Sequence, residues 1–254
     1  MKISIITVVY NNRTYIEDCI LSVAGQTYKN VEYIIVDGGS TDGTVDIIRK
    51  YDARISMWTS EPDIGIYDAM NKGISKATGD VIGLLNADDV YFNDEVLEKV
   101  ASVMSDLSLD ACYADLTYVD CKDLNKTVRY WRSRQFETGF FKKGWVPPHP
   151  TFFARKKIYD NFGIFDLDFK LAADFELMAR FLERYMIRSN YIPSIFVKMR
   201  LGGATNKSLI NIMKQNIEIV RACRKNTIEI SLISFLCNKI TDRFKQFLLK
   251  PATH

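Results

Sequence analysis

The stretch Asp80-Val-Ile-Gly-Leu-Leu-Asn-Ala-Asp-Asp89 decides the fold. Its first half, Val81 to Leu85, is a short apolar run, which is typical of a buried strand in a parallel sheet. Asn86, Asp88 and Asp89 follow directly, at the carboxyl end of that strand. Open α/β sheets bind ligands just beyond the carboxyl ends of their strands. The stretch therefore predicts a ligand site at the end of a central strand.

The two adjacent carboxylates, Asp88 and Asp89, would repel each other unless positive charge lies near them. A hard divalent cation with oxygen ligands, one that also carries substrate phosphates, would supply that charge. A second interpretation is a helix N-cap, because the segment Asp94-Glu95-Val96-Leu97 suits the start of a helix. The segment alone leaves both interpretations open.

Strand and helix patterns alternate through the first third of the chain. We predict strands over residues 3–10, 31–36, 54–59 and 81–85, and helices over 16–25, 44–51 and 64–77. This β-α-β-α-β-α-β order implies an α/β fold with parallel pairing and right-handed crossovers. No G-x-G-x-x-G follows the first strand and no G-x-x-x-x-G-K-[ST] occurs, so dinucleotide and P-loop binding are unsupported.

The middle of the chain mixes further strands and helices. We predict helices over 95–104, 156–161 and 171–182, and strands over 111–116, 128–131, 151–154 and 195–199, the first two of these strands paired antiparallel. Between them, residues 132–143 form an irregular basic and aromatic loop. The cations of this loop suit either an acceptor pyrophosphate or plain solvent: Arg132, Arg134, Lys142 and Lys143.

Bulk properties indicate an ordinary globular protein. The chain has 254 residues, enough for a large core, and is 47% hydrophobic and 26% charged. No apolar run approaches the roughly 20 residues of a membrane span, and a strand pattern begins at Ile3 without a cleavable signal. The five cysteines are odd in number and scattered, which favours reduced thiols in a cytosolic protein.

The C-terminal segment differs from the rest in charge. Residues 205–254 hold nine Lys or Arg and three Asp or Glu, and we predict an amphipathic helix over 228–249. Its apolar side contains seven residues: Ile233, Leu236, Cys237, Ile240, Phe244, Phe247 and Leu248. Such a helix can lie in a membrane interface, or pack on the domain or on a second subunit in a homodimer. Its continuous apolar face argues against nucleic acid as the partner.

Three motifs at predicted strand ends resemble one known family. The segments 5–12 (IITVVYNN), 36–44 (VDGGSTDGT) and 85–89 (LNADD) resemble the family 2 inverting glycosyltransferases with the GT-A fold. The segment 61–73 (EPDIGIYDAMNKG) looks like the subgroup that builds bacterial surface polysaccharides such as O-antigen, capsule or colanic acid. The resemblance implies a GT-A catalytic domain over 1–204, with a Rossmann-like, mostly parallel central sheet flanked by helices. Residues 205–254 then form a basic helical tail.

The resemblance assigns the donor nucleotide to the ends of the first two strands. Asp37 matches the family's aspartate that accepts hydrogen bonds from the base, and Thr7, Val9 and Tyr10 would line the same pocket. A turn-capping role before two glycines is the alternative for Asp37. In this picture Asp68 and Lys72 also lie near the nucleotide. Their spacing of four residues equally suits a plain ion pair on a helix.

The resemblance also assigns a metal. Asp88 occupies the last position of the family's D-x-D motif and would bind Mn²⁺ or Mg²⁺, which bridges the donor diphosphate. Asn86 replaces the first aspartate of that motif, so it keeps an oxygen for a sugar hydroxyl but lacks the charge. Ala87 stands between them, and Asp89 would contact the donor sugar or support the site from behind.

Asp174 matches the general base of the family's E-D motif, although Ala173 precedes it instead of an acidic residue. Inversion requires a base on the side opposite the leaving diphosphate. A helix N-terminal charge is the alternative for Asp174, and Glu176 should point elsewhere. His149, in a proline-rich loop, would hydrogen-bond the sugar or the diphosphate, or be structural.

The sequence thus predicts an inverting, metal-dependent transferase. It would move one hexose or N-acetylhexosamine from a nucleotide sugar, most simply UDP-linked, to a lipid-pyrophosphate-linked saccharide at the inner face of the plasma membrane. The Q-x-x-R-W motif of processive synthases is absent. Two alternatives remain: a sugar nucleotidyltransferase, and a non-catalytic subunit that binds nucleotide sugars.

Overall fold

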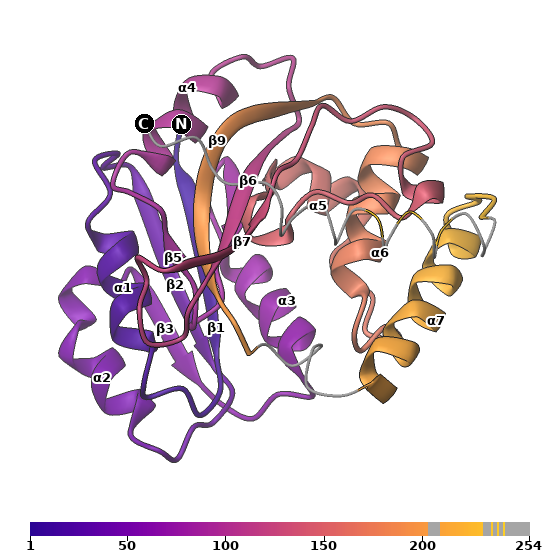
Figure 1. Cartoon of the computed structure of the whole chain (residues 1–254). Coiled ribbons are helices and arrows are strands. Elements are labelled where there is room, and N and C mark those ends of the chain that lie inside the picture. Colours follow the sequence, from indigo (N-terminus) through magenta and orange to yellow (C-terminus); the bar gives the residue numbers. More distant parts are fainter. Residues whose placement is uncertain (203–208, 231–234, 236–237, 239–240, 242–254) are drawn as a thin grey trace.

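The computed structural model describes residues 1–202, 209–230, 235, 238 and 241. Within them, one mixed sheet of nine strands runs in the order β3-β2-β1-β4-β8-β6-β9-β5, with β7 paired to β6. Helices cover both faces of the sheet, α1 and α2 on one side and α3, α5 and α6 on the other (Figure 1). The predicted α/β class with a Rossmann-like central sheet is confirmed.

The first four strands are parallel, as predicted. They are β1 (Ile3–Val9), β2 (Val31–Asp37), β3 (Met57–Ser60) and β4 (Val81–Leu84). The helices between them are α1 (Ile16–Ala24), α2 (Thr44–Lys50) and α3 (Ile66–Lys76). β3 begins later than predicted because Asp52–Arg54 forms a 3₁₀ turn.

The second half adds strands in both directions. Its elements are β5 (Val90–Tyr91), α4 (Val96–Met104), β6 (Ala111–Val119), β7 (Thr127–Trp131), β8 (Phe153–Arg155), α5 (Lys156–Phe162), α6 (Ala173–Ala179), β9 (Ser189–Arg200) and α7 (Leu209–Lys225). β6 and β7 are antiparallel, as predicted, and β8 lies antiparallel between β4 and β6. β8 starts two residues later than predicted, because a 3₁₀ turn, His149–Thr151, precedes it.

The helix-cap interpretation of Asp88 and Asp89 is wrong. β5 (Val90–Tyr91) comes between these residues and α4, and α4 begins only at Val96. Glu95 stands at its N-cap, without a side-chain hydrogen bond. The acidic pair therefore lies at the carboxyl end of β4, where ligands of open sheets bind.

Close packing holds α3 against β1 and α7 against α6. A Cβ at Gly73 would lie 2.4 Å from Cγ2 of Ile6, so only glycine lets α3 approach β1 this closely. α7 lies beside α6 (Figure 1), and Ile219, Ala222 and Cys223 of α7 are buried in the same apolar cluster as α6. Both helices are thereby held next to the N-terminus of α6.

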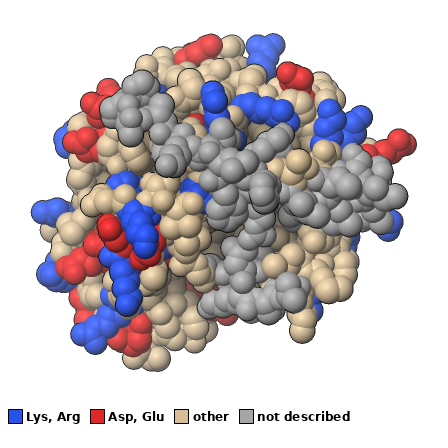
Figure 2. Space-filling model, in the orientation of Figure 1, with Lys and Arg blue, Asp and Glu red and all other residues tan. Residues whose placement is uncertain are grey.

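Most of the predicted tail helix, residues 228–249, lies outside the described residues, as do all seven apolar positions named for it. The boundary between residues 204 and 205 therefore stays a prediction. Among the residues that the structure describes, no helix is long and apolar enough to span a membrane. On the face shown in Figure 2, the described acidic and basic side chains are interspersed rather than sorted by sign.

Glu32 gives the fold a pH dependence. Its carboxylate accepts hydrogen bonds from Lys2 Nζ (2.7 Å), Ser4 Oγ (2.5 Å), Thr78 N (2.8 Å) and Thr78 Oγ1 (2.6 Å). Burial alone would raise the pKa of Glu32, but these bonds outweigh it and lower the pKa from 4.5 to about 2. A depressed native pKa stabilises the fold above the unfolded-state pKa, and that stability is lost as the pH falls from 4.5 toward 2.

We therefore expect Glu32→Gln to lower the free energy of unfolding by about 2 kcal/mol at pH 7. Urea denaturation at pH 7 and pH 3 measures this. The gap between wild type and variant should shrink at pH 3, and exposed Glu98→Gln is the control. A gap that stays constant between the two pH values would show that the charge of Glu32 is not the source of the stability.

Candidate active site

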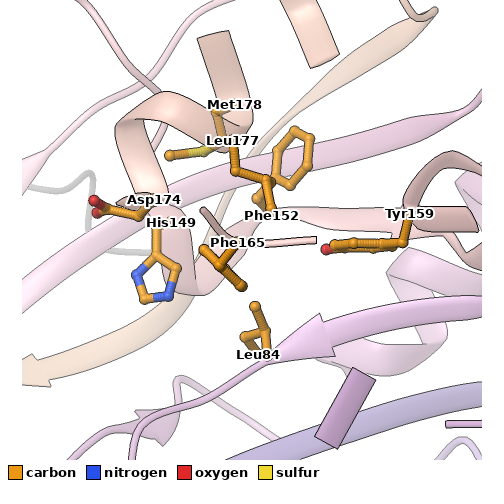
Figure 3. Close-up of a pocket in the computed structure, with 8 residues that line it drawn as sticks. All are labelled: Leu84, His149, Phe152, Tyr159, Phe165, Asp174, Leu177 and Met178. Atoms are coloured by element: carbon orange, nitrogen blue, oxygen red, sulfur yellow. The ribbon is translucent and has the colours of Figure 1, made fainter. Parts of the chain in front are cut away.

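A small pocket lies where the end of β4 meets α6 and the turn before β8. Eight residues line it: Leu84, His149, Phe152, Tyr159, Phe165, Asp174, Leu177 and Met178. Figure 3 shows Asp174 and His149 side by side at one edge of a largely apolar lining. Residues far apart in the sequence therefore share one pocket, and one of them, Leu84, comes four residues before Asp88.

Asp174 is the second residue of α6, and its carboxylate is partly exposed. The hydroxyl of Tyr67, on α3, donates a hydrogen bond of 3.2 Å to its Oδ1. The predicted base thus lies at the mouth of the pocket with one oxygen already oriented. Glu176 points elsewhere, as predicted, because its side chain is buried and pairs with Arg180 at 2.9 Å.

His149 lies beside Asp174 (Figure 3). Burial lowers the pKa of His149, and the charge of Asp174 only partly offsets that effect. Its ring is therefore neutral near pH 7. Its Nε2 is buried and has no hydrogen-bond partner within the described residues. An unpaired ring nitrogen next to the candidate base can accept or donate a hydrogen bond to a bound sugar.

The acidic pair divides into two environments. Asp89 is fully buried, and burial together with the neighbouring charge of Asp88 raises the pKa of Asp89 well above its usual value. Its Oδ2 accepts a weak hydrogen bond of 3.5 Å from Asn86 Nδ2. Asp88 is partly exposed. Of the two carboxylates, that of Asp88 is exposed enough to contact a ligand, whereas that of Asp89 is enclosed in the protein.

Arg200, at the end of β9, holds this loop in place. Its guanidinium donates to the carbonyl oxygen of Asp88 at 2.7 Å and to Asp18 Oδ2 at 2.5 Å, and it lies 4.5 Å above the ring of Tyr15. The strand predicted over 195–199 ends one residue before Arg200, and the sequence indicated no role for this arginine. Its partners are distant in the chain, so no local pattern could have indicated this role.

The oxygens at the end of β4 fit a hard divalent cation. Asn86 Oδ1 and Asp89 Oδ1 are buried and have no hydrogen-bond partner in the described part of the chain. That same part contains no group of three or more His, Cys, Asp or Glu residues placed to hold a metal. A cation here would rely on Asp88 and on substrate phosphates, as Mg²⁺ commonly does.

Asp37 follows the turn-capping interpretation. Its Oδ2 accepts hydrogen bonds from the backbone N–H of Gly39 (3.1 Å) and Ser40 (2.9 Å) and from Ser60 Oγ (2.6 Å). Its Oδ1 accepts one from Ser40 Oγ at 2.5 Å. The carboxylate is buried and shapes the loop after β2. Its predicted contact with a nucleotide base stays a prediction.

The other predicted base-pocket residues occupy different environments. Thr7 is buried, its hydroxyl accepts a hydrogen bond from Tyr33 at 3.1 Å, and it lies 3.6 Å from Cys19 Sγ. The side chain of Thr7 therefore faces the core, and its predicted place in the nucleotide pocket stays a prediction. Val9 is also buried, whereas Tyr10 is 65% exposed at the carboxyl end of β1, where a base can reach it.

Asp68 and Lys72 form the ion pair that their spacing suggested, at 3.5 Å. Lys72 Nζ also donates to the carbonyl oxygen of Pro62 at 3.0 Å and lies 3.5 Å from Glu61. The carboxylate of Asp68 accepts from the N–H of Ile64 at 3.2 Å. These contacts hold the loop before α3, and a contact with the nucleotide stays a prediction.

The basic loop is anchored by its aromatic residues. Phe141 is fully buried, and the guanidinium of Arg134 lies 4.2 Å from the ring centre of Phe140. Lys142 and Lys143 are exposed. The loop is thus a packed segment with exposed cations rather than a freely solvated strand connection.

Comparison with known proteins identifies related chains. Residues 4–164 match the sequence profile of the family described as Glycosyl transferase family 2. An uncharacterized glycosyltransferase of Mycobacterium tuberculosis is 33% identical over 180 residues, covering 70% of this chain and 68% of the relative. The PGL/p-HBAD biosynthesis glycosyltransferase of Mycobacterium bovis is 26% identical over 211 residues, covering 82% and 80%.

Solved structures share the fold. Staphylococcus aureus TarS (residues 1–349), in complex with UDP-GlcNAc, superposes with a TM-score of 0.68 at 18% identity, covering 95% of this chain and 73% of that chain. The mannosyltransferase PcManGT from Pyrobaculum calidifontis, in complex with GDP-Man and Mn²⁺, gives 0.65 at 17% identity, covering 95% and 69%. At these identities the likeness establishes the GT-A-like architecture alone.

Proposed function

This chain belongs to glycosyl transferase family 2, and on that premise we propose that it transfers one hexose or N-acetylhexosamine from a nucleotide sugar to a saccharide acceptor, with inversion. One observation carries the proposal: Asp174 lines a pocket that also reaches Leu84, just before Asp88. The structural relatives were solved with UDP-GlcNAc and with GDP-Man, which supports a nucleotide-sugar donor. We favour a UDP-linked donor.

In this mechanism the acceptor hydroxyl attacks the anomeric carbon in line with the departing diphosphate. Asp174 takes the proton of that hydroxyl, the new C–O bond forms, and the electron pair of the broken bond leaves with the nucleoside diphosphate. His149, neutral beside Asp174, hydrogen-bonds the sugar through its unpaired nitrogen. The apolar lining keeps water, a competing acceptor, away from the reacting carbon.

A divalent cation, Mn²⁺ or Mg²⁺, would neutralise the charge that develops on the leaving diphosphate. Asp88 would be the protein residue that holds this cation. Asn86, two residues earlier, has a side-chain oxygen without a hydrogen-bond partner among the described residues, which would suit a hydroxyl of the donor. The solved complex of the Pyrobaculum mannosyltransferase with GDP-Man and Mn²⁺ supports this assignment.

The leaving group tests the proposal against its alternatives. Purified protein is incubated with UDP-, GDP- and dTDP-sugars, Mn²⁺ or Mg²⁺ and a synthetic lipid-pyrophosphate saccharide. Acceptor-dependent release of nucleoside diphosphate supports glycosyl transfer. Release of pyrophosphate in a parallel incubation with a nucleoside triphosphate and a sugar phosphate would support a nucleotidyltransferase. Binding of donor without turnover would support a non-catalytic subunit.

We further propose a lipid-linked acceptor at the cytoplasmic face of the membrane, as in surface-polysaccharide assembly. The basic composition of residues 205–254 supports this proposal. So do three exposed apolar residues along one side of α7, namely Ile210 (64% exposed), Met213 (65%) and Ile217 (67%). The same features suit a homodimer, which the next experiment separates from membrane binding.

Deletion of residues 228–254 is expected to weaken sedimentation with vesicles containing about one third anionic lipid, because it removes a predicted basic amphipathic helix. Raising the salt concentration should weaken binding of the full chain in the same assay. Vesicle binding that is unchanged by the deletion, combined with a shift from dimer to monomer in size-exclusion chromatography, would instead assign the segment to protein packing.

A further inference from the structure

The N-terminus of α6, which carries Asp174, has no cap of its own. Ala172 stands at the N-cap, where it offers no side-chain acceptor, and no side-chain cap bond is made from that position. The first N–H groups of a helix have no intrahelical partner and need acceptors from elsewhere. α6 continues at its far end into a π-helical turn, Arg180–Arg184, so it is the start of the helix, next to Asp174, that needs contacts from neighbouring elements.

Glu218, on α7, binds the segment that leads into α6, including the N–H of the N-cap residue Ala172. Its carboxylate accepts three backbone hydrogen bonds, from the N–H of Lys170 (3.1 Å), Leu171 (2.8 Å) and Ala172 (2.9 Å). These three residues lead directly into α6. Hydrogen bonds to a charged acceptor are about twice as strong as neutral ones. Glu218 therefore fixes the approach to α6 more firmly than an ordinary capping side chain would.

Tyr67 fixes the carboxylate itself. Its hydroxyl donates to Asp174 Oδ1 at 3.2 Å, and its ring is stacked on Phe165 with centroids 5.4 Å apart. Burial, together with the charge of Asp174, raises the pKa of Tyr67 well above its usual value, so the hydroxyl remains a donor. With Oδ1 engaged, Oδ2 is the oxygen left to receive a proton from an acceptor.

We propose that Tyr67 and Glu218 are positioning residues for Asp174: Tyr67 orients its carboxylate and Glu218 holds the start of its helix. The proposal rests on the proposed function of Asp174 as base. It makes α7 part of the catalytic apparatus, although this helix lies outside the region, residues 4–164, that matches the family profile. In the transfer step neither residue gains or loses a proton, and both act through Asp174.

Tyr67→Phe keeps the stacked ring and removes only the donor. We expect kcat to fall about 10- to 100-fold, while KM for donor and acceptor changes less than about twofold, since only the orientation of the base is lost. His149 and Glu218, two other ionisable residues near Tyr67 and Asp174, are unchanged in this variant.

Glu218→Gln keeps an oxygen acceptor but loses the charge, and we expect a kcat about 10-fold below that of the wild type. Glu218→Asp, which keeps the charge on a shorter side chain, should recover part of that loss. Arg224→Gln, which changes an exposed cation, is the matched control on the same helix. Thermal melting of all variants checks that each one is folded.

The decisive comparison uses the Asp174→Asn background. If Tyr67 and Glu218 act through Asp174, adding Tyr67→Phe or Glu218→Gln to Asp174→Asn causes no further loss of kcat. A multiplicative loss in the double variants, or wild-type kcat in both single variants, would overturn the proposal. Failure of the proposed function has a separate signature, since the wild type itself would then release no nucleoside diphosphate with any donor and acceptor.

Discussion

Asp174→Asn is expected to lower kcat about a thousand-fold while leaving the fold and the affinity for the donor intact. General-base catalysis by a positioned side chain contributes roughly 10²- to 10⁴-fold, and asparagine cannot take a proton. Asparagine is also close in size and can still accept the hydrogen bond from Tyr67, so the helix should not move. The measurement is initial-rate kinetics by nucleoside diphosphate release, with donor affinity from calorimetry.

The control for this variant is Asp168→Asn, a few residues earlier in the same segment. The side chain of Asp168 is 74% exposed and takes part only in a surface pair with Arg221, which contributes little to stability. The Asp168→Asn variant should therefore retain the kcat of the wild type. Activity of Asp174→Asn within tenfold of the wild type would remove Asp174 from the role of base.

Asp88→Ala is expected to lower kcat at least a hundred-fold and to abolish the response to added Mn²⁺ or Mg²⁺. Metal-ion stabilisation of a leaving phosphate supplies several kcal/mol, and each 1.4 kcal/mol corresponds to about tenfold in rate. The backbone contact of Asp88 with Arg200 uses its carbonyl oxygen, so the substitution leaves that contact available. Donor affinity should be measured with and without metal.

The exposed Asp94→Ala is the matched control for Asp88→Ala, because it removes a nearby carboxylate, between β5 and α4, without touching the end of β4. It should bind donor and respond to metal as the wild type does. If Asp88→Ala kept a normal metal response, the cation would be held elsewhere and the assignment of this loop would fail.

The parallel half of the fold could be predicted because its signals are local. β-branched runs such as Ile3–Val9 and Val31–Asp37, each followed by a helical period, determine both the element type and the parallel pairing. The antiparallel insertion of β8 between β4 and β6 could not be predicted in this way. It depends on fits between distant residues, such as Gly83, where a Cβ would lie 2.3 Å from the ring of Phe153.

The candidate site likewise contains residues that the sequence could indicate and residues that it could not. The motif positions of Asp88 and Asp174 were visible in the sequence, and the structure brings the end of β4 and the start of α6 to one pocket. The burial of Asp89 and the inward-facing hydroxyl of Thr7 were not visible, because a motif does not show on which side of the backbone a side chain lies. Glu218 was invisible because its partners are backbone N–H groups.

The proposed reaction is a single in-line displacement, with the base on one side of the anomeric carbon and the diphosphate on the other. The configuration of the anomeric carbon in the product, read from its proton coupling constant by NMR when the reaction is run to completion with an α-linked nucleotide sugar, tests it most directly. We predict a β-linked product. An α-linked product would mean retention, and would contradict the assignment of Asp174 as a base acting opposite the leaving group.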